Sequence, residues 1–319
     1  MDGSLRNLLL GVLLAWGLLT ACSAPPLDDD RPQPSAFFLE TGDGVALAVT
    51  DRGRTTVEGG GVTLVLLHGL ACDQRSFDSL VGPLTRRYRV VSFDGAGHGA
   101  TQGTRPKATV HSFGEDAAFV VERLDLERVV FVGHSMGGPV GLLATARVPD
   151  RVIGVIGLDT LHDLSWRMTP DLLEPVLGAF ERDFDGTMEN SIRSMYAADE
   201  STRGLERTLE VAKRTDHATV LKLMESFLDF RPGLAAEAAD RPIRCVNAAA
   251  SPTPTDVAGN RARAPRGYDA VLLDGVGHFL HLTHPDRTRA AVEVFLRELV
   301  GLEGTPAQAP PGQVPARAR

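Results

Sequence analysis

The sequence is poor in cysteine, carries no basic patch and has one long apolar run. Its three cysteines in 319 residues show no spacing typical of a zinc site, and no glycine-rich nucleotide loop occurs. We therefore expect neither a metal nor a cofactor. Cys72 and Cys245 lie in segments expected to be two strands apart in a sheet, so we expect no disulfide between them. A net charge of −8 argues against nucleic acid as a partner.

The one long apolar run covers residues 8–19, too short to span a bilayer comfortably but right for a signal-peptide core. It ends in Leu-Thr-Ala-Cys at Cys22, which resembles the signal of bacterial lipoproteins. The resemblance implies a signal peptide over residues 1–21 and a protein held by lipid on Cys22, on the extracytoplasmic side of the cell membrane or outer membrane. An ordinary signal peptide cut elsewhere is the alternative. Residues 22–36, rich in proline and aspartate, predict a tether.

Residues 133–138, GHSMGG, carry the strongest functional signal. The β-branched run 128–132 before them predicts a buried strand, and the Ala- and Leu-rich run 137–147 after them predicts a helix. A serine in a sharp turn between a strand and a helix, with glycine two residues to each side, is typical of the turn called a nucleophile elbow. We therefore predict that Ser135 is a nucleophile, with the amide of Met136 pointing toward the attacked carbonyl.

A serine nucleophile needs a base and an acid, which follow it along the chain in this type of site. His278 lies in a glycine-flanked segment, DGVGHF, directly after the strand-like run 268–273. We predict that His278 is the base. His281 and His284 we interpret as structural, because His284 precedes a proline that is typical of the first position of a helix.

Together with the run VTLVLLHGL at residues 62–70, these features resemble the α/β-hydrolase family over residues 37–302. The resemblance implies an α/β fold: a mostly parallel eight-stranded sheet, helices on both faces and a helical cap at about residues 160–240, after strand six. It also implies an oxyanion hole formed by the backbone amides of Leu70 and Met136.

The acid departs from the usual family pattern, in which it follows the seventh strand. That strand is expected at residues 243–248, and the Ala-Ala-Ser after it offers no carboxylate. We place the acid at Asp159, directly after the sixth strand, whose end neighbours that of the seventh. Asp256 is the alternative, although it more plausibly starts a helix.

Other local signals complete the expected organisation. Residues 37–51 predict an antiparallel hairpin, and Ser112 with Glu115 predicts a capping box that opens a helix through Leu124. The Pro-, Ala- and Arg-rich residues 303–319 predict a disordered tail.

The predicted function is that of a serine hydrolase that cleaves a small carboxylic ester or related acyl substrate through an acyl-enzyme. The alternative is a ligand-binding receptor with slow or no turnover.

Overall fold

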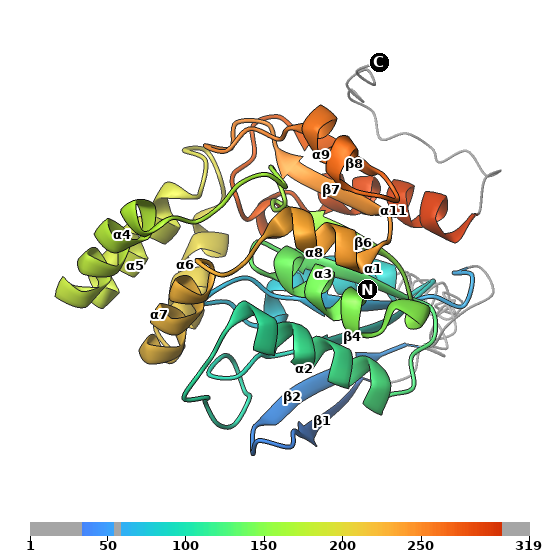
Figure 1. The fold of residues 1–319 in the computed structure, drawn as a ribbon, viewed down its shortest axis with the longest axis horizontal. Helices are drawn as coiled ribbons and strands as arrows, with labels where there is room; N and C mark the ends of the chain where they lie inside the picture. The colour runs from blue at the N-terminus through green and yellow to red at the C-terminus, as the bar shows by residue number, and fades with distance from the viewer. Residues whose placement is uncertain (1–33, 54–58, 302–319) are drawn as a thin grey trace, which may run out of the picture. The chain divides into compact units, whose positions relative to one another are not determined.

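The computed structural model describes residues 34–53 and 59–301, which contain one eight-stranded sheet of order β1-β2-β4-β3-β5-β6-β7-β8 (Figure 1). β1 pairs with β2, and β2 with β4, in antiparallel fashion, while all other neighbours are parallel. The predicted fold class is therefore confirmed. The strands are β1 (Ser35–Glu40), β2 (Ala46–Arg52), β3 (Thr63–Leu67), β4 (Arg89–Phe93), β5 (Val129–His134), β6 (Val152–Leu158), β7 (Ile243–Ala248) and β8 (Tyr268–Leu273).

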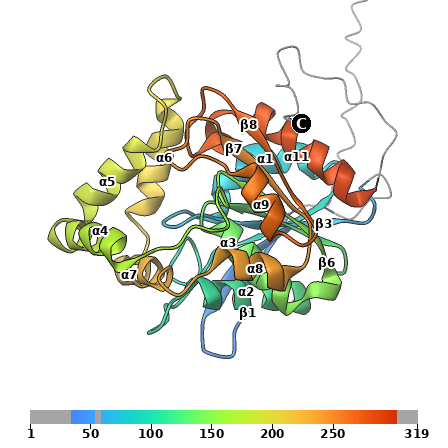
Figure 2. The same cartoon turned by 45° about the horizontal axis from the view of Figure 1, so that its top comes forward.

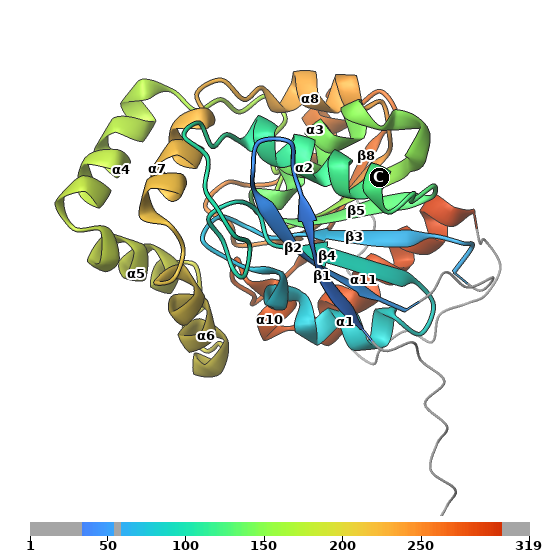
Figure 3. The same cartoon turned by 90° about the horizontal axis from the view of Figure 1, so that it is seen from below.

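Helices cover both faces of the sheet, which buries alternate residues of the central strands in two apolar clusters (Figure 3). Val65 and Phe131 face one cluster, and their neighbours Leu66 and Val132 face the other. The helices on the first face are α2 (Val110–Arg123), α3 (Gly137–Arg147) and α8 (Pro232–Ala239); those on the second are α1 (Asp78–Leu84), α10 (Leu280–Thr283) and α11 (Pro285–Val300).

The chain between β6 and β7 forms helices α4 to α8, of which α4 to α7 stand off one end of the sheet (Figure 2). A third apolar cluster joins these helices to the sheet: Phe180 and Met188 pack with Cys72, which follows β3, and with Phe279, which precedes α10. The helical insertion is therefore packed at the carboxyl ends of the parallel strands. The remaining helices are α4 (Pro170–Arg182), α5 (Phe184–Ser194), α6 (Thr202–Ala212), α7 (His217–Ser226) and α9 (Val257–Arg263).

Two local predictions need correction. The capping box of α2 is formed by Thr109 and Ser112, whose side chains each bond the other's backbone N–H, so Ser112 is the third helical residue rather than the cap. Thr109 has an extended backbone, with φ of −138°, and its hydroxyl oxygen accepts a hydrogen bond from the amide of Ser112 in the first turn of the helix. β1 begins at Ser35, within the segment predicted as tether.

The predicted signal peptide, Cys22 and the predicted tail at 303–319 lie outside the described residues. Within residues 34–53 and 59–301, no helix is long and apolar enough to cross a membrane.

Candidate active site

Ser135 lies in a turn between β5 and α3 that only glycine neighbours permit. Its φ is +52°, a left-handed conformation that costs a non-glycine residue energy and is typical of strained functional turns. A Cβ on Gly133 would lie 2.2 Å from the carbonyl oxygen of Gly137, and one on Gly137 would lie 2.1 Å from that of Leu67. The close approach of strand and helix therefore requires both glycines, as the sequence predicts for a nucleophile elbow.

Asp159 and His278 lie in direct contact. Asp159 follows β6, is 4% exposed, and places Oδ2 at 2.6 Å from Nδ1 of His278. Its Oδ1 accepts a hydrogen bond of 2.8 Å from the amide of Ala248, which ends β7. Asp256 instead caps α9, where its carboxylate accepts from the amide of Gly259. The structure thus brings Asp159, and not Asp256, to His278.

The Asp159 turn and the His278 loop both lie against the elbow. The amide of Ser135 bonds the carbonyl of Leu158, and the Thr160 hydroxyl donates to the carbonyl of Ser135 at 2.7 Å. The ring of His134, next to the serine, lies 4.7 Å from the ring of His278, and its Nε2 is 3.1 Å from the His278 carbonyl oxygen. Within the described part of the chain the Ser135 hydroxyl makes no hydrogen bond, and the side-chain bond of His278 is the one to Asp159.

The two amides predicted for the oxyanion hole are both unused. Neither the N–H of Leu70 nor that of Met136 donates a hydrogen bond among the described residues. A Cβ on Gly69 would lie 3.2 Å from Cβ of Ser135, so the loop after β3 packs against the elbow. The amide of the next residue, Ala71, donates to Nε2 of His98 at 3.3 Å, which fixes this loop. Two free backbone donors therefore flank the serine, as oxyanion stabilisation requires.

Three of the buried histidines near these loops have a lowered pKa. Burial lowers the pKa of His98 and of His281 to about 3, and it holds the pKa of His134 well below its ordinary value. Both ring nitrogens of His281, and Nδ1 of His134, lack a hydrogen-bond partner within the described residues. These rings are neutral at pH 7, so His278 has no cationic histidine beside it there.

Glu200 also lies at the loop that carries His278, and no sequence motif predicts it. Its carboxylate, in the segment between α5 and α6, accepts hydrogen bonds from the amide of Gly277 and the hydroxyl of Thr283, which bracket His278. The amide of His278 itself donates to the carbonyl of Met195 at 2.8 Å. The helical insertion therefore holds the histidine loop in place. No local signal identifies Glu200, because a charged segment such as 199–201 is typical of a solvated loop.

The two described cysteines are free and buried. Burial raises the pKa of Cys72 and Cys245 to about 12, so both thiols stay protonated and unreactive at neutral pH. Within residues 34–53 and 59–301, no group of three or more His, Cys, Asp or Glu side chains is arranged to hold a metal ion.

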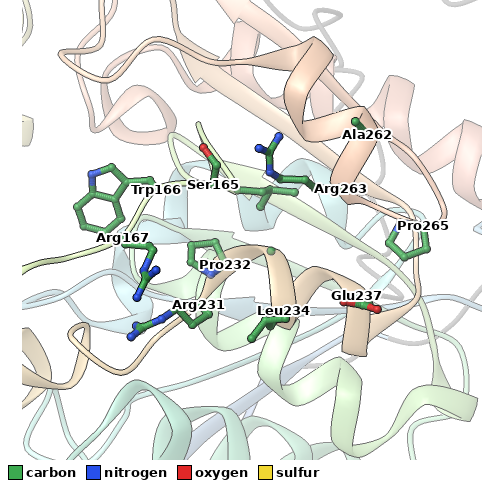
Figure 4. Close-up of a pocket in the computed structure, with 12 residues that line it drawn as sticks. Ser165, Trp166, Arg167, Arg231, Pro232, Leu234, Glu237, Ala262, Arg263 and Pro265 are labelled. Atoms are coloured by element: carbon green, nitrogen blue, oxygen red, sulfur yellow. The ribbon is translucent and has the colours of Figure 1, made fainter.

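The structure has an open groove of about 510 Å³ on its surface (Figure 4). It is lined by the segment after β6, by α8 and by α9, with Trp166, Arg167, Arg231 and Arg263 among the lining side chains. None of the predicted catalytic residues lines it. The groove is therefore a separate surface feature.

Comparisons with known proteins agree with this architecture. The profile of the family described as "alpha/beta hydrolase fold" matches residues 62–203. An esterase from Exiguobacterium antarcticum superposes with a TM-score of 0.73 at 16% identity, over 82% of this chain and 100% of that one. The sheet topology, the turn at Ser135 and these comparisons together show that the chain has the α/β-hydrolase fold.

Related sequences match only in part. A putative non-heme haloperoxidase of Mycobacterium phage D29 is 32% identical over 116 residues, 36% of this chain and 42% of that protein. The Karrikin insensitive 2 receptor CA of Petunia hybrida is 26% identical over 144 residues, 43% of this chain and 50% of the receptor. The chain thus spans half or less of the length of these relatives.

Proposed function

We propose that the protein is a serine hydrolase that cleaves a carboxylic ester, or a related acyl compound, through a covalent acyl-enzyme. Ser135 is the nucleophile, His278 the general base and acid, and Asp159 the residue that orients His278. The amides of Leu70 and Met136 stabilise the oxyanion. The contact that carries the proposal is the 2.6 Å bond between Asp159 and His278, beside a serine held at φ +52°.

The geometry supports the following sequence of steps. Asp159 accepts the Nδ1–H of His278, which leaves Nε2 unprotonated and able to take the Ser135 proton as Oγ attacks the acyl carbon. The tetrahedral oxyanion collapses, and the protonated His278 gives its proton to the leaving alkoxide. Water then attacks the acyl-enzyme, with His278 again removing and returning one proton, and releases the acid and free serine.

The direct test is steady-state hydrolysis of p-nitrophenyl esters of short acids by the wild-type protein and by Ser135→Ala. The wild type is expected to turn over repeatedly, and the variant to lose that activity while keeping its fold. A folded wild-type protein that hydrolyses no ester, thioester or amide in a broad panel would overturn the proposal.

A ligand-binding receptor is the second candidate, because the Petunia receptor named above is among the relatives. A receptor that retains a triad binds its ligand and turns over slowly or not at all. The same assay separates the two: a single burst without further product supports the receptor, and sustained turnover supports the enzyme.

We also propose that Cys22 is lipidated and that the protein is held at the extracytoplasmic face of a bacterial membrane. The support is the sequence alone: an apolar run ending in Leu-Thr-Ala-Cys, followed by a proline-rich segment. Stable anchoring requires two or more acyl chains, because one chain binds only weakly.

A further inference from the structure

The segment 195–201, which joins α5 to α6 in the helical insertion, lies against the loop that carries His278. The amide of His278 donates to the carbonyl of Met195 at 2.8 Å, and the amide of Gly277, the preceding residue, donates to Oε1 of Glu200 at 2.9 Å. A Cβ on Gly277 would lie 2.5 Å from the Met195 carbonyl oxygen and 2.6 Å from Oε2 of Glu200. The insertion and the loop are therefore in direct contact at the residue before His278.

The carboxylate of Glu200 bonds both of these segments. Oε1 accepts the amide of Gly277 and, at 2.7 Å, the hydroxyl of Thr283 at the end of α10, while Oε2 accepts the amide of Ala197 at 2.8 Å. Because Oε2 is fixed within its own segment, Oε1 is directed at the His278 loop. This one oxygen thus holds the chain on both sides of His278.

Glu200 is buried, which sets it apart from other carboxylates of the insertion. Its side chain is 1% exposed, whereas that of Glu210 on α6 is 62% exposed. Burial of a carboxylate is costly unless donors surround it. At Glu200 these donors are the two amides and the hydroxyl, with Nδ1 of His284 also 3.4 Å from Oε1. The site is therefore built around this side chain rather than around a solvated surface charge.

The loop that carries His278 has little rigidity of its own. Its sequence at residues 274–278, DGVGH, contains two glycines, which restrict the backbone least. Gly275 has φ of +66°, and among the described residues no atom lies within 4 Å of the place where its Cβ would be. The position of His278 therefore depends on contacts from outside the loop. Asp159 supplies one on the side of the sheet, and the segment 195–201 supplies those on the side of the insertion.

We propose that Glu200 is a positioning residue, whose Oε1 holds the backbone around His278 so that the imidazole stays aligned with Asp159 for proton transfer from Ser135. This inference rests on the proposed function, because the alignment affects a rate only if His278 takes the serine proton. A misplacement of a catalytic group by about 1 Å can cost on the order of a hundredfold in rate. The helical insertion then aligns the general base as well as covering the site.

The test compares Glu200→Ala, which removes the carboxylate, with Glu200→Gln, whose amide oxygen can take the place of Oε1. We expect Glu200→Ala to lower kcat roughly ten- to a hundredfold and to change KM little, because so buried a side chain does not contact substrate. The stacking of Tyr196 on Phe279, with ring centroids 4.9 Å apart, remains to keep the insertion docked. Glu200→Gln is expected to restore most of kcat.

Glu210→Ala is the matched control, because Glu210 is an exposed glutamate of the same insertion that pairs with Arg214 on α6. It is expected to leave kcat and KM unchanged. If Glu200→Ala does not fold, Thr283→Val removes one donor to Oε1 and leaves the carboxylate in place, and it is expected to lower kcat by a smaller factor. Wild-type kcat in folded Glu200→Ala or, should that variant not fold, in Thr283→Val would overturn the inference. A loss confined to KM would do so too, since it indicates a defect in substrate binding.

An NMR measurement separates this inference from the proposed function. In the inactive Ser135→Ala background with isotope-labelled histidine, the ring signals of His278 report its surroundings without any turnover. We expect these signals to shift and broaden in Glu200→Ala, to return toward their starting positions in Glu200→Gln, and to stay in place in Glu210→Ala. Unchanged signals in Glu200→Ala refute the positioning role even if the enzyme is active. Changed signals in a protein without hydrolase activity refute only the proposed function.

Discussion

Replacement of Asp159 by asparagine is the substitution whose outcome the geometry defines most closely. The amide of Ala248 donates to Oδ1, so an asparagine there keeps its single oxygen toward Ala248 and turns its NH₂ group toward Nδ1 of His278. That NH₂ is a donor, and it forces Nδ1 to accept and Nε2 to carry the hydrogen. The imidazole then cannot remove the Ser135 proton, although every residue remains in place.

We expect Asp159→Asn to lower kcat on the order of ten-thousand-fold, which corresponds to about 5.5 kcal/mol of transition-state stabilisation. The backbone should tolerate the change, because asparagine accepts the left-handed conformation that Asp159 adopts at φ +47°. The assay is steady-state hydrolysis of a p-nitrophenyl ester, with circular dichroism to verify the fold.

Asp256→Asn is the matched control, since asparagine caps a helix as well as aspartate does and Asp256 bonds Gly259 rather than His278. It is expected to retain nearly wild-type kcat. If Asp256→Asn were the damaging substitution and Asp159→Asn the silent one, the assignment of the acid would be refuted.

Three further predictions follow from the same structure. Ser135→Ala should lower kcat about a million-fold with the fold intact, and near wild-type turnover by the purified variant would contradict the role of Ser135. His98, His134 and His281 are neutral when folded because burial lowers each pKa from 6.5, so their contribution to stability is complete above pH 6.5 and falls as the pH drops below it, down to about pH 3 for His98 and His281. Urea unfolding should then show a loss of about 1.4 kcal/mol per pH unit for each ring, and a stability that is flat from pH 7 to 5 would contradict the buried neutral state. Mass spectrometry of the native N-terminus should find a lipid-modified Cys22, and Cys22→Ser should release the protein or leave it unprocessed with its activity unchanged; an unmodified peptide cut elsewhere would exclude the anchor.

The strands and the elbow could be predicted because their signals are local. The β-branched run before Ser135 is buried on both faces of a parallel sheet, and the flanking glycines reflect contacts within the same turn. The position of Asp159 was predicted from the neighbouring ends of β6 and β7. The capping box of α2 was misplaced by three residues because Thr109 and Ser112 are both suitable cap residues, and only the backbone angles distinguish them.

The supporting residues around the site could not be predicted, because their partners are distant in sequence. Glu200 bonds Gly277 across 77 positions, and Asn247 bonds Thr160 across 87. Nothing in the segments around these side chains indicates that the chain returns there. His162 likewise contacts the Thr255 hydroxyl across 93 positions.

The central claim is that Ser135 is an activated nucleophile, and covalent labelling tests it most directly. The protein is treated with a fluorophosphonate, which reacts with activated serines, and the site of labelling is mapped by mass spectrometry of the intact protein and its peptides. We expect one phosphonyl group, on Ser135, that is absent in Ser135→Ala and forms far more slowly in Asp159→Asn. A folded protein that remains unlabelled, or that is labelled at another residue, would contradict it.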